Sequence, residues 1–299
     1  MICSDRVVVI TGAAHGIGRA HAHAFAEAGA CVVVNDLGTS THGEGQSAEA
    51  AEQVAADIRK GGGRAIAHFG SCSTEEGANG MVEAAIAEFG GLDAIVNNAG
   101  ILRDRMFVSS SVEEWDAVMN VHLRGHFLVG NAAARYWRAE AKAGRTREAR
   151  IINTSSGAGL QGSVGQSAYS CAKGGIAALT LVQAAELGRY GVTANAIAPA
   201  ARTRMTEAVF ADMMAKPESG FDAMDPANIS PLVVWLASRD SSAVSGRVFE
   251  VQGGKISVAD GWRPGPEVDR GARWDPADVG PAVHALLDQA LSPAPVYGA

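Results

Sequence analysis

Short runs of β-branched and other apolar residues alternate with longer alanine-rich segments of helical period along most of this chain. The runs Val7–Thr11, Cys31–Asn35 and Arg64–His68 are separated by expected helices over residues 16–28 and 47–60. Runs that are apolar on both faces are typical of parallel strands that helices cover from both sides. Because crossovers between parallel strands are right-handed, the pattern predicts an α/β fold with a single doubly wound, Rossmann-type domain.

The same alternation continues as far as residue 251. It predicts helices over residues 75–89, 112–138 and 169–190, and strands over residues 94–97, 150–154, 193–198 and 248–251. We therefore expect a seven-stranded parallel sheet with helices on both faces. The pattern breaks at residues 38–45, 139–148 and 204–227 and again beyond Gly253, and we expect the first two breaks to be solvated loops.

The later part of the chain is interpreted from composition and helix signals. Residues 1–262 are expected to form one domain, within which residues 204–227 cover the substrate. The apolar and adaptable side chains of that segment are Met205, Phe210, Met213 and Met214. Residues 263–299 are expected to be a C-terminal extension, in which Asp275-Pro276 is a typical helix start and residues 279–291 form a short amphipathic helix.

Bulk properties exclude several classes of function. The chain has 299 residues, a formal net charge of −7 and no separate basic stripe, so we expect no nucleic-acid partner. Its apolar runs are far shorter than the roughly 20 residues that cross a bilayer. No leader pattern precedes the first strand, and we expect a cytoplasmic protein. Scattered cysteines and unclustered histidines predict reduced thiols and no metal site.

A glycine-rich turn lies between the first expected strand and the first expected helix. Gly12, Gly16 and Gly18 stand in it, with His15 and Ile17 between them. Glycines let the backbone turn sharply and approach a pyrophosphate, which the positive N-terminus of the helix then binds. The alternative is a helix-initiating turn without a ligand. Because strand, turn and helix follow in this order, we expect these five residues to bind a dinucleotide cofactor.

The second expected strand is followed by a carboxylate, Asp36, about 20 residues after the glycines. At that place it can accept hydrogen bonds from the adenosine ribose hydroxyls and would repel a 2′-phosphate. No arginine or lysine stands in the glycine turn or beside Asp36 to neutralise such a phosphate. The sequence therefore favours NAD over NADP, the alternative being that Asp36 merely begins a solvated loop.

Ser156, Tyr169 and Lys173 follow the spacing Ser-x12-Tyr-x3-Lys. Tyr169 and Lys173 are one helical turn apart and share a face, and Ser156 follows the preceding strand toward the same crevice. An ammonium near a phenol lowers the pKa of the phenol, so we expect Tyr169 to act as a base, Ser156 to hold the substrate oxygen and Lys173 to bind ribose hydroxyls. The alternative without a function is a tyrosine and a lysine on the solvent-exposed surface of an amphipathic helix.

With these motifs the chain resembles the short-chain dehydrogenase/reductase family over about its first 260 residues. Thr11-Gly12-x-x-x-Gly16-x-Gly18, Asn97-Asn98-Ala99-Gly100, the Ser156/Tyr169/Lys173 set and Asn195-Ala196-Ile197-Ala198-Pro199 carry the resemblance. It implies that Asn98, Ala99, Gly100 and Pro199 line the cofactor groove and that Thr203 contacts the nicotinamide carboxamide. Finer stretches, among them Ile101-Leu102-Arg103-Asp104-Arg105 and Val121-His122-Leu123-Arg124-Gly125, are similar to the (3R)-hydroxyacyl-CoA dehydrogenase module of peroxisomal multifunctional enzyme type 2 and to bacterial hydroxysteroid-type relatives.

The sequence departs from the family pattern at several positions. His122 stands where the family has an asparagine of its proton relay, and we expect it to take a catalytic part although a structural role is the alternative. Ser71 and Cys72 occupy the region of the usual adenine-contacting acid, and Ala200 follows Pro199 in place of a glycine. Arg103 and Arg105 suggest a second hypothesis, contact with an anionic part of the substrate such as a CoA phosphate.

Several functions remain open. The sequence favours an NAD-dependent oxidoreductase that moves a hydride between a secondary alcohol and its ketone, with a 3-hydroxyacyl-CoA or a hydroxysteroid as substrate. The alternatives are a non-catalytic dinucleotide-binding sensor or scaffold and an NADP-dependent 3-ketoacyl reductase. The expected helices over residues 112–138 and 169–190 are apolar on more than one face, which predicts a homodimer or homotetramer.

Overall fold

A computed structural model of the chain describes residues 1–45, 47–207 and 214–298. The strands are β1 Val7–Thr11, β2 Cys31–Asn35, β3 Arg64–His68, β4 Ala94–Asn97, β5 Ala149–Thr154, β6 Val192–Ala200, β7 Arg247–Gln252 and β8 Lys255–Ala259. The α-helices are α1 Gly16–Glu27, α2 Glu49–Lys60, α3 Glu75–Phe89, α4 Val112–Met119, α5 Gly125–Lys142, α6 Gly157–Gln161, α7 Ser167–Leu187, α8 Arg204–Glu207, α9 Ser230–Ala237 and α10 Pro276–Leu287.

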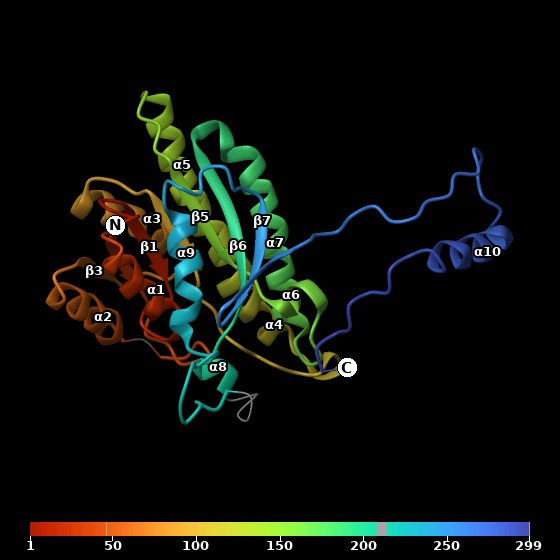
Figure 1. The fold of residues 1–299 in the computed structure, drawn as a ribbon, viewed down its shortest axis with the longest axis horizontal. Helices are drawn as coiled ribbons and strands as arrows, with labels where there is room; N and C mark the ends of the chain where they lie inside the picture. Colours follow the sequence, from red (N-terminus) through yellow and green to blue (C-terminus); the bar gives the residue numbers. More distant parts are fainter. Residues whose placement is uncertain (46, 208–213, 299) are drawn as a thin grey trace.

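The strands form one sheet in the order β3-β2-β1-β4-β5-β6-β7-β8. The chain starts in the middle of the sheet, adds strands toward one edge and then crosses over to build the other half, which is the doubly wound α/β arrangement predicted from the sequence. Helices cover both sides of the sheet (Figure 1). One apolar core joins the sheet to α1, α2 and α9, and a second joins its other face to α3 and α5.

The sheet has one strand more than the seven that the sequence predicted. β1 to β7 are parallel, as expected, but β8 returns antiparallel to β7, with Gln252 paired to Lys255. The two-residue turn Gly253-Gly254 makes this return, and Gly253 adopts the positive φ of 54° that such hairpin turns require. The sequence alternation was followed no further than Gly253, so the strand over residues 255–259 was missing from the prediction.

Two other sequence boundaries differ from the structure. The predicted helix over residues 112–138 runs on to Lys142, so the break expected from residue 139 begins later. A π-helical turn, Asn120–Arg124, interrupts that helix between α4 and α5. Such turns are frequent at functional sites, and this one contains His122. The short C-terminal helix begins at Pro276, as the Asp275-Pro276 signal predicted, but it ends at Leu287 and not at residue 291. The division of the chain at residue 262 stays a prediction.

The start of α1 packs against the turn that precedes it more closely than any side chain would allow. A Cβ added at Gly18 would lie 2.1 Å from the carbonyl oxygen of Gly12 and 2.5 Å from the side-chain nitrogen of Asn98. Because the closest atom belongs to the backbone, no side-chain rotation relieves the overlap. Gly18 thereby fixes how closely the first helix approaches the carboxyl ends of β1 and β4.

The variant Gly18→Ala should lower the free energy of unfolding by about 2 to 3 kcal/mol, because the turn must shift to admit the methyl group. Urea unfolding followed by circular dichroism measures this difference. The matched control is Gly188→Ala, where an added Cβ meets no atom within 4 Å and the backbone is right-handed helical. That control should change the unfolding free energy by less than about 1 kcal/mol; equal effects of the two substitutions would contradict the packing argument.

Candidate active site

A cleft with a volume of about 960 Å³ opens at the carboxyl ends of the central strands, where the strand order reverses between β1 and β4. Ligands of doubly wound sheets bind at this kind of position. All residues that the sequence singled out for catalysis or cofactor binding line it: Gly12, His15, Gly16, Ile17, Gly18, Asp36, Asn98, Ala99, Gly100, His122, Ser156, Tyr169, Lys173, Pro199 and Thr203. Their roles stay predictions, but the fold brings them to one place.

The glycine turn forms one end of the cleft. Gly12 has a φ of 65°, and a Cβ on it would lie 2.8 Å from the Cα of Ala99, so the two turns after β1 and β4 touch through their backbones. His15 is the N-cap residue of α1 and makes no side-chain capping bond. The first N–H groups of α1 thus have no capping side chain, which fits an anionic group at this helix terminus.

The turn also faces the segment that follows β6. A Cβ placed on Gly16 would meet the methyl group of Thr203 at 3.4 Å. The backbone N–H of Thr203 donates a hydrogen bond to the hydroxyl of Thr206 at 2.8 Å, which fixes this segment at the first turn of α8. Thr203 therefore lies next to the glycine turn, and its contact with the nicotinamide stays a prediction of the family resemblance.

Asn98 has a structural part in addition to its place on the cleft wall. Its side-chain nitrogen donates hydrogen bonds to the carbonyl oxygens of Thr11 and Gly12, at 3.0 and 3.1 Å. In return, the Thr11 hydroxyl accepts from the backbone N–H groups of Asn98 and Ala99, at 2.9 and 3.1 Å. These four bonds fasten the two central turns to each other.

The carboxylate of Asp36 is held in a fixed orientation by backbone donors. One oxygen accepts from the N–H of Ala14 at 2.9 Å and the other from the N–H of Gly38 at 2.8 Å. Each oxygen still has a lone pair free for a ribose hydroxyl. The carboxylate is thus placed between the glycine turn and the start of the loop over residues 38–45.

That loop is not simply solvated, as the sequence had suggested. Thr39, Thr41 and Gly43 are among the residues that line the cleft, and the Thr41 carbonyl oxygen accepts from the N–H of Leu102 at 3.2 Å. The loop therefore lies against the segment after β4. The sequence pattern missed this because the loop has polar composition and its partner is about 60 residues away in the chain.

Ser156, Tyr169 and Lys173 come together on the opposite wall. Ser156 is the N-cap residue of α6, directly after β5, while Tyr169 and Lys173 share one face of α7. The Lys173 ammonium lies 5.5 Å from the centre of the Tyr169 ring and donates a hydrogen bond to the carbonyl oxygen of Thr154 at 2.7 Å. The hydroxyl of Ser155 donates to the Lys173 carbonyl oxygen at 2.8 Å and so ties α7 to the end of β5.

The electrostatics of this wall differ from the expectation in one respect. Burial raises the pKa of Tyr169, and a hydrogen bond with Ser156 opposes the rise. Burial also lowers the pKa of the Lys173 ammonium to about 7, so that its positive charge is only partly present at neutral pH. Without a bound cofactor, desolvation of the phenolate outweighs the hydrogen bond from Ser156, so the pKa of Tyr169 lies above its usual value. The lowering that the sequence predicts from Lys173 together with an oxidised nicotinamide stays a prediction.

His122 is buried next to Tyr169. Its ring meets the Tyr169 ring edge-on, with centroids 5.2 Å apart. Its Nε2 is 2.8 Å from the carbonyl oxygen and 3.0 Å from the nitrogen of Ile101, which anchors the segment after β4. Burial and the nearby Lys173 lower the pKa of His122 well below 6.5, so the imidazole is neutral. Its backbone carbonyl oxygen accepts a hydrogen bond from Nδ1 of His126 at 2.7 Å.

The sequence did not single out two further residues that line the cleft, the acid Asp104 and its partner Gln166. Asp104 lines the cleft and accepts a hydrogen bond from Nε2 of Gln166 at 2.8 Å. Burial raises the pKa of Asp104, and its negative charge also raises the pKa of Tyr169. The neighbouring Arg103 and Arg105, for which the sequence left contact with an anionic substrate as a hypothesis, pair with Glu44 at 3.5 Å and Glu114 at 3.0 Å.

The expected substrate-covering segment is described in part. Arg202 donates to the carbonyl oxygen of Met214 at 3.1 Å and forms an ion pair with Asp222, and Met214 and Met224 line the cleft. Phe210 and Met213 lie outside the described residues, as does the side chain of Met205. In the part of the chain that is described, no group of three or more His, Cys, Asp or Glu side chains is arranged to hold a metal ion. Nor is any described helix long and apolar enough to span a membrane.

Two known proteins with similar sequences are named as a dehydrogenase and as a multifunctional enzyme. Hydroxyacyl-CoA dehydrogenase ChsB1 of Mycobacterium tuberculosis is 44% identical over 283 residues, which are 92% of this chain and 86% of that protein. Peroxisomal multifunctional enzyme type 2 of Mus musculus is 44% identical over 84% of this chain and 32% of its own length, so the chain spans about a third of it.

Solved structures and family profiles agree with these relatives. The crystal structure of a short chain dehydrogenase from Mycobacterium avium superposes with a TM-score of 0.90 at 58% sequence identity, covering 100% of both chains. The family model described as short chain dehydrogenase matches residues 6–214. The chain therefore belongs to the short chain dehydrogenase family.

Proposed function

We propose that this protein is an NAD-dependent dehydrogenase that oxidises a secondary alcohol, with a 3-hydroxyacyl-CoA as the leading substrate class. One observation carries the proposal: Ser156, Tyr169 and Lys173 lie on one wall of a cleft whose other end is the glycine turn and the N-terminus of α1. A hydride acceptor held along the turn would thus lie beside an oxygen held at Ser156 and Tyr169.

The residues divide the proton chemistry between them. The Ser156 hydroxyl donates to the substrate oxygen and fixes its position, and the phenol oxygen of Tyr169 accepts the hydroxyl proton during oxidation. Bound NAD would accept the hydride and would place the positive charge of its nicotinamide beside Tyr169, which favours the phenolate. Lys173, which is only 3% exposed, is held by Thr154 where it can reach the ribose hydroxyls.

His122 completes the proposed site as a positioning residue. Its edge contact with the Tyr169 ring and its hydrogen bonding to the Ile101 backbone place it between the tyrosine and the segment after β4. A neutral imidazole adds no charge to a site in which Lys173 is already buried. Its catalytic part, predicted from the family pattern, therefore consists in keeping the phenol in place.

The choice of NAD rests on Asp36. Both of its oxygens are oriented by backbone N–H groups, so the carboxylate cannot swing away from an incoming 2′-phosphate without breaking two hydrogen bonds. The same hydrogen bonds leave acceptor capacity for the ribose hydroxyls. An NADP-dependent 3-ketoacyl reductase is disfavoured on this ground.

The substrate class follows from the relatives and the cleft. A relative of 44% identity over 92% of this chain is named a hydroxyacyl-CoA dehydrogenase. The walls beyond the catalytic residues include Ile101, Leu102, Val164 and Met224, which suit an acyl chain or an equally apolar ring system such as a steroid. The ion pairs of Arg103 and Arg105 compete with a CoA phosphate, and neither arginine is among the lining residues, so their contact with CoA stays a hypothesis.

A sensor or scaffold that binds the dinucleotide without turnover is the alternative of a different class. It is disfavoured because burying Lys173 beside the partly buried Tyr169 is energetically costly, and a protein that only binds the dinucleotide has no use for the tyrosine. The cytoplasmic location and the division into residues 1–262 and 263–299 remain part of the proposal.

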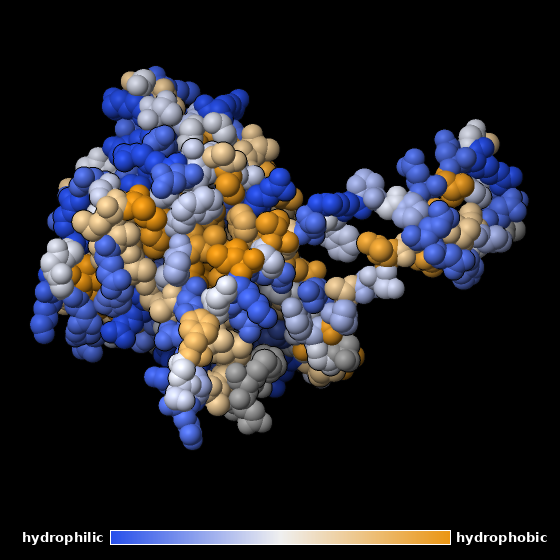
Figure 2. Space-filling view, in the orientation of Figure 1, coloured by the Kyte–Doolittle hydropathy of each residue, from blue (hydrophilic) through white to orange (hydrophobic). Residues whose placement is uncertain are grey.

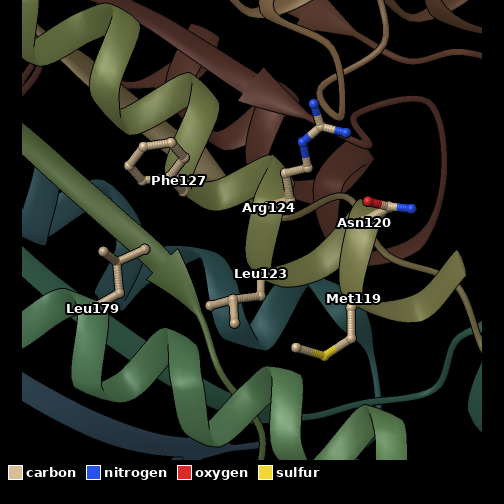
Figure 3. Close-up of a pocket in the computed structure, with 6 residues that line it drawn as sticks. All are labelled: Met119, Asn120, Leu123, Arg124, Phe127 and Leu179. Carbon is tan, nitrogen blue, oxygen red and sulfur yellow. The ribbon is translucent and has the colours of Figure 1, made fainter. Parts of the chain in front are cut away.

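Assembly into a homodimer or homotetramer is also proposed. A groove of about 390 Å³ crosses the helices on one flank, where Met119, Leu123 and Phe127 point toward Leu179 of α7 (Figure 3). Figure 2 shows apolar residues gathered over α9 and β7 on another face, and Trp235, Ile256 and Val258 are exposed in this part of the structure. Two separate apolar surfaces are what a tetramer with two kinds of interface requires.

The variant Tyr169→Phe should lose about 100- to 10,000-fold in kcat while it still binds NAD, because the proton acceptor is removed and the ring remains. Absorbance of reduced nicotinamide measures turnover with a panel of 3-hydroxyacyl-CoAs and hydroxysteroids, and fluorescence measures NAD binding. Tyr190→Phe, at a tyrosine remote from the cleft, is the control. A Tyr169→Phe protein with full activity would refute the mechanism.

The rate of oxidation by the unmodified protein should rise with pH, since Tyr169 must be ionised to accept the proton.

The variant Asp36→Ala should reduce the preference for NAD over NADP at least about tenfold in kcat/KM, because the charge that repels a 2′-phosphate is gone. The comparison needs both cofactors at a fixed substrate concentration, with the surface substitution Glu88→Gln as control. If the unmodified protein already used NADP as well as NAD, the assignment of Asp36 as the selecting group would fail.

Light scattering coupled to gel filtration at micromolar concentration should give two or four times the 30.7 kDa mass of one chain. The variant Phe127→Asp should lower this mass, because it puts a charge on the groove between α5 and α7, whereas Asp116→Asn on the exposed side of α4 should not. A monomeric mass for the unmodified protein would contradict the proposed assembly.

A further inference from the structure

The C-terminal end of the chain returns to the body of the protein next to the proposed catalytic residues. After β8 the chain runs outward through α10, which lies apart from the sheet and its helices, and then ends beside α6 (Figure 1). There Tyr297 pairs with residues 162–164 like a parallel strand. The N–H of Val164 donates to the Tyr297 carbonyl oxygen at 2.9 Å, and the N–H of Tyr297 donates to the Gly162 carbonyl oxygen at 3.2 Å.

Side-chain contacts at this junction are equally close. The Tyr297 ring lies against Gly157, where an added Cβ would stand 2.8 Å from the phenol oxygen and 3.1 Å from Cε2. The methyl groups of Val296 are in ordinary van der Waals contact with Gly162, at 3.5 and 3.6 Å from its Cβ position. Because Gly157 is the residue after Ser156, the Tyr297 ring is placed next to the hydroxyl that holds the substrate oxygen.

Tyr297 and Gly298 also belong to the wall of the 960 Å³ cleft, together with Ser156 and Val164. The Tyr297 side chain is 46% exposed, so the face that does not touch Gly157 is open. A phenol presents a broad apolar face with a polar tip, which suits contact with an apolar substituent. Trp262, a second large aromatic residue of the C-terminal part, is 104% exposed and does not line the cleft.

We propose that residues 296–298 form the outer wall of the substrate end of the cleft, and that Tyr297 is a specificity-determining residue whose ring contacts the apolar substituent next to the reacting carbon. This inference rests on the proposed function, since it takes the substrate to be a secondary alcohol held at Ser156 and Tyr169. The ring limits the width of the cleft at this point, and the rest of the apolar lining continues from it through Val164.

Kinetics of full-length variants test the contact. Tyr297→Ala should raise KM for 3-hydroxyacyl-CoAs about tenfold, because the apolar contact is lost, and should shift the order of kcat/KM toward bulkier acyl groups. NAD affinity should not change. Tyr297→Phe keeps the ring and should stay within about twofold of the unmodified protein. Trp262→Ala is the matched control, and a Tyr297→Ala protein that equals it in KM and in the order of substrates would overturn the proposal.

A crosslink tests the position of the segment without any substrate. A Cβ on Gly298 would lie 3.6 Å from the Cβ of Val164, within the roughly 3.5 to 4.5 Å range of disulfides. In a Cys171→Ser background, which removes the exposed native thiol, Val164→Cys with Gly298→Cys should oxidise to a crosslinked species of monomer mass on a non-reducing gel. Val164→Cys with Trp262→Cys should not.

The outcomes separate the two proposals. A crosslinked species of dimer mass would assign the segment to a neighbouring subunit and overturn the assignment to the chain's own end. Because Gly298 has a φ of 77°, which strains a cysteine, the kinetics decide where the crosslink fails. If Tyr297→Ala then equals Trp262→Ala in a protein that turns over substrate, this inference alone is overturned. Absence of turnover by the unmodified protein across the substrate panel counts against the proposed function, and the specificity of Tyr297 falls with it even where the crosslink forms.

Discussion

Hydrogen bonds between the end of β1 and the turn after β4 hold the two halves of the sheet together where the strand order reverses. The Thr11 hydroxyl accepts two backbone N–H groups from that turn, and the side chain of Asn98 donates back to two carbonyl oxygens of the glycine turn. At the ends of parallel strands these peptide groups have left the ladder and need other partners. Because the two turns satisfy each other, the cleft between them is preformed and every wall of it takes its position from this junction.

The opposite wall depends on a second polar network at the next strand ends. Asn97 donates to Asn153 at 3.0 Å, and Asn153 donates in turn to Thr180 and Gln183 of α7. This network fixes the helix that carries Tyr169 and Lys173. Among the described residues no carboxylate pairs with the buried Lys173 ammonium on that helix, and burial brings its pKa down to about 7. Burying an ammonium without a carboxylate partner costs stability, and strongly shifted pKa values of this kind are typical of functional sites.

The central fold and the core of the site were predictable because their signals are local. A strand, a glycine turn and a helix follow one another within about 20 residues, and Tyr169 and Lys173 share a helix face by spacing alone. The features that were missed depend on contacts distant in sequence. Burial in the cleft raises the pKa of Asp104, against the opposing effect of its hydrogen bond from Gln166, and burial lowers the pKa of Lys173. No spacing in the sequence reveals either burial. The strand β8 did carry a local signal, the Gly253-Gly254 pair, but its alternation of apolar and polar residues is only five residues long.

Tyr297 had no local signal at all, and its position has a consequence for how the cleft can open. Three residues held by two backbone hydrogen bonds would bind weakly as a free peptide. They are joined to the body by the extension that contains α10, and this covalent connection keeps the segment near its binding place, as a linker raises the effective concentration of any attached group. Opening the cleft at this wall would therefore break only those two backbone hydrogen bonds and the side-chain contacts of residues 296–298, and it would leave the sheet and its helices in place.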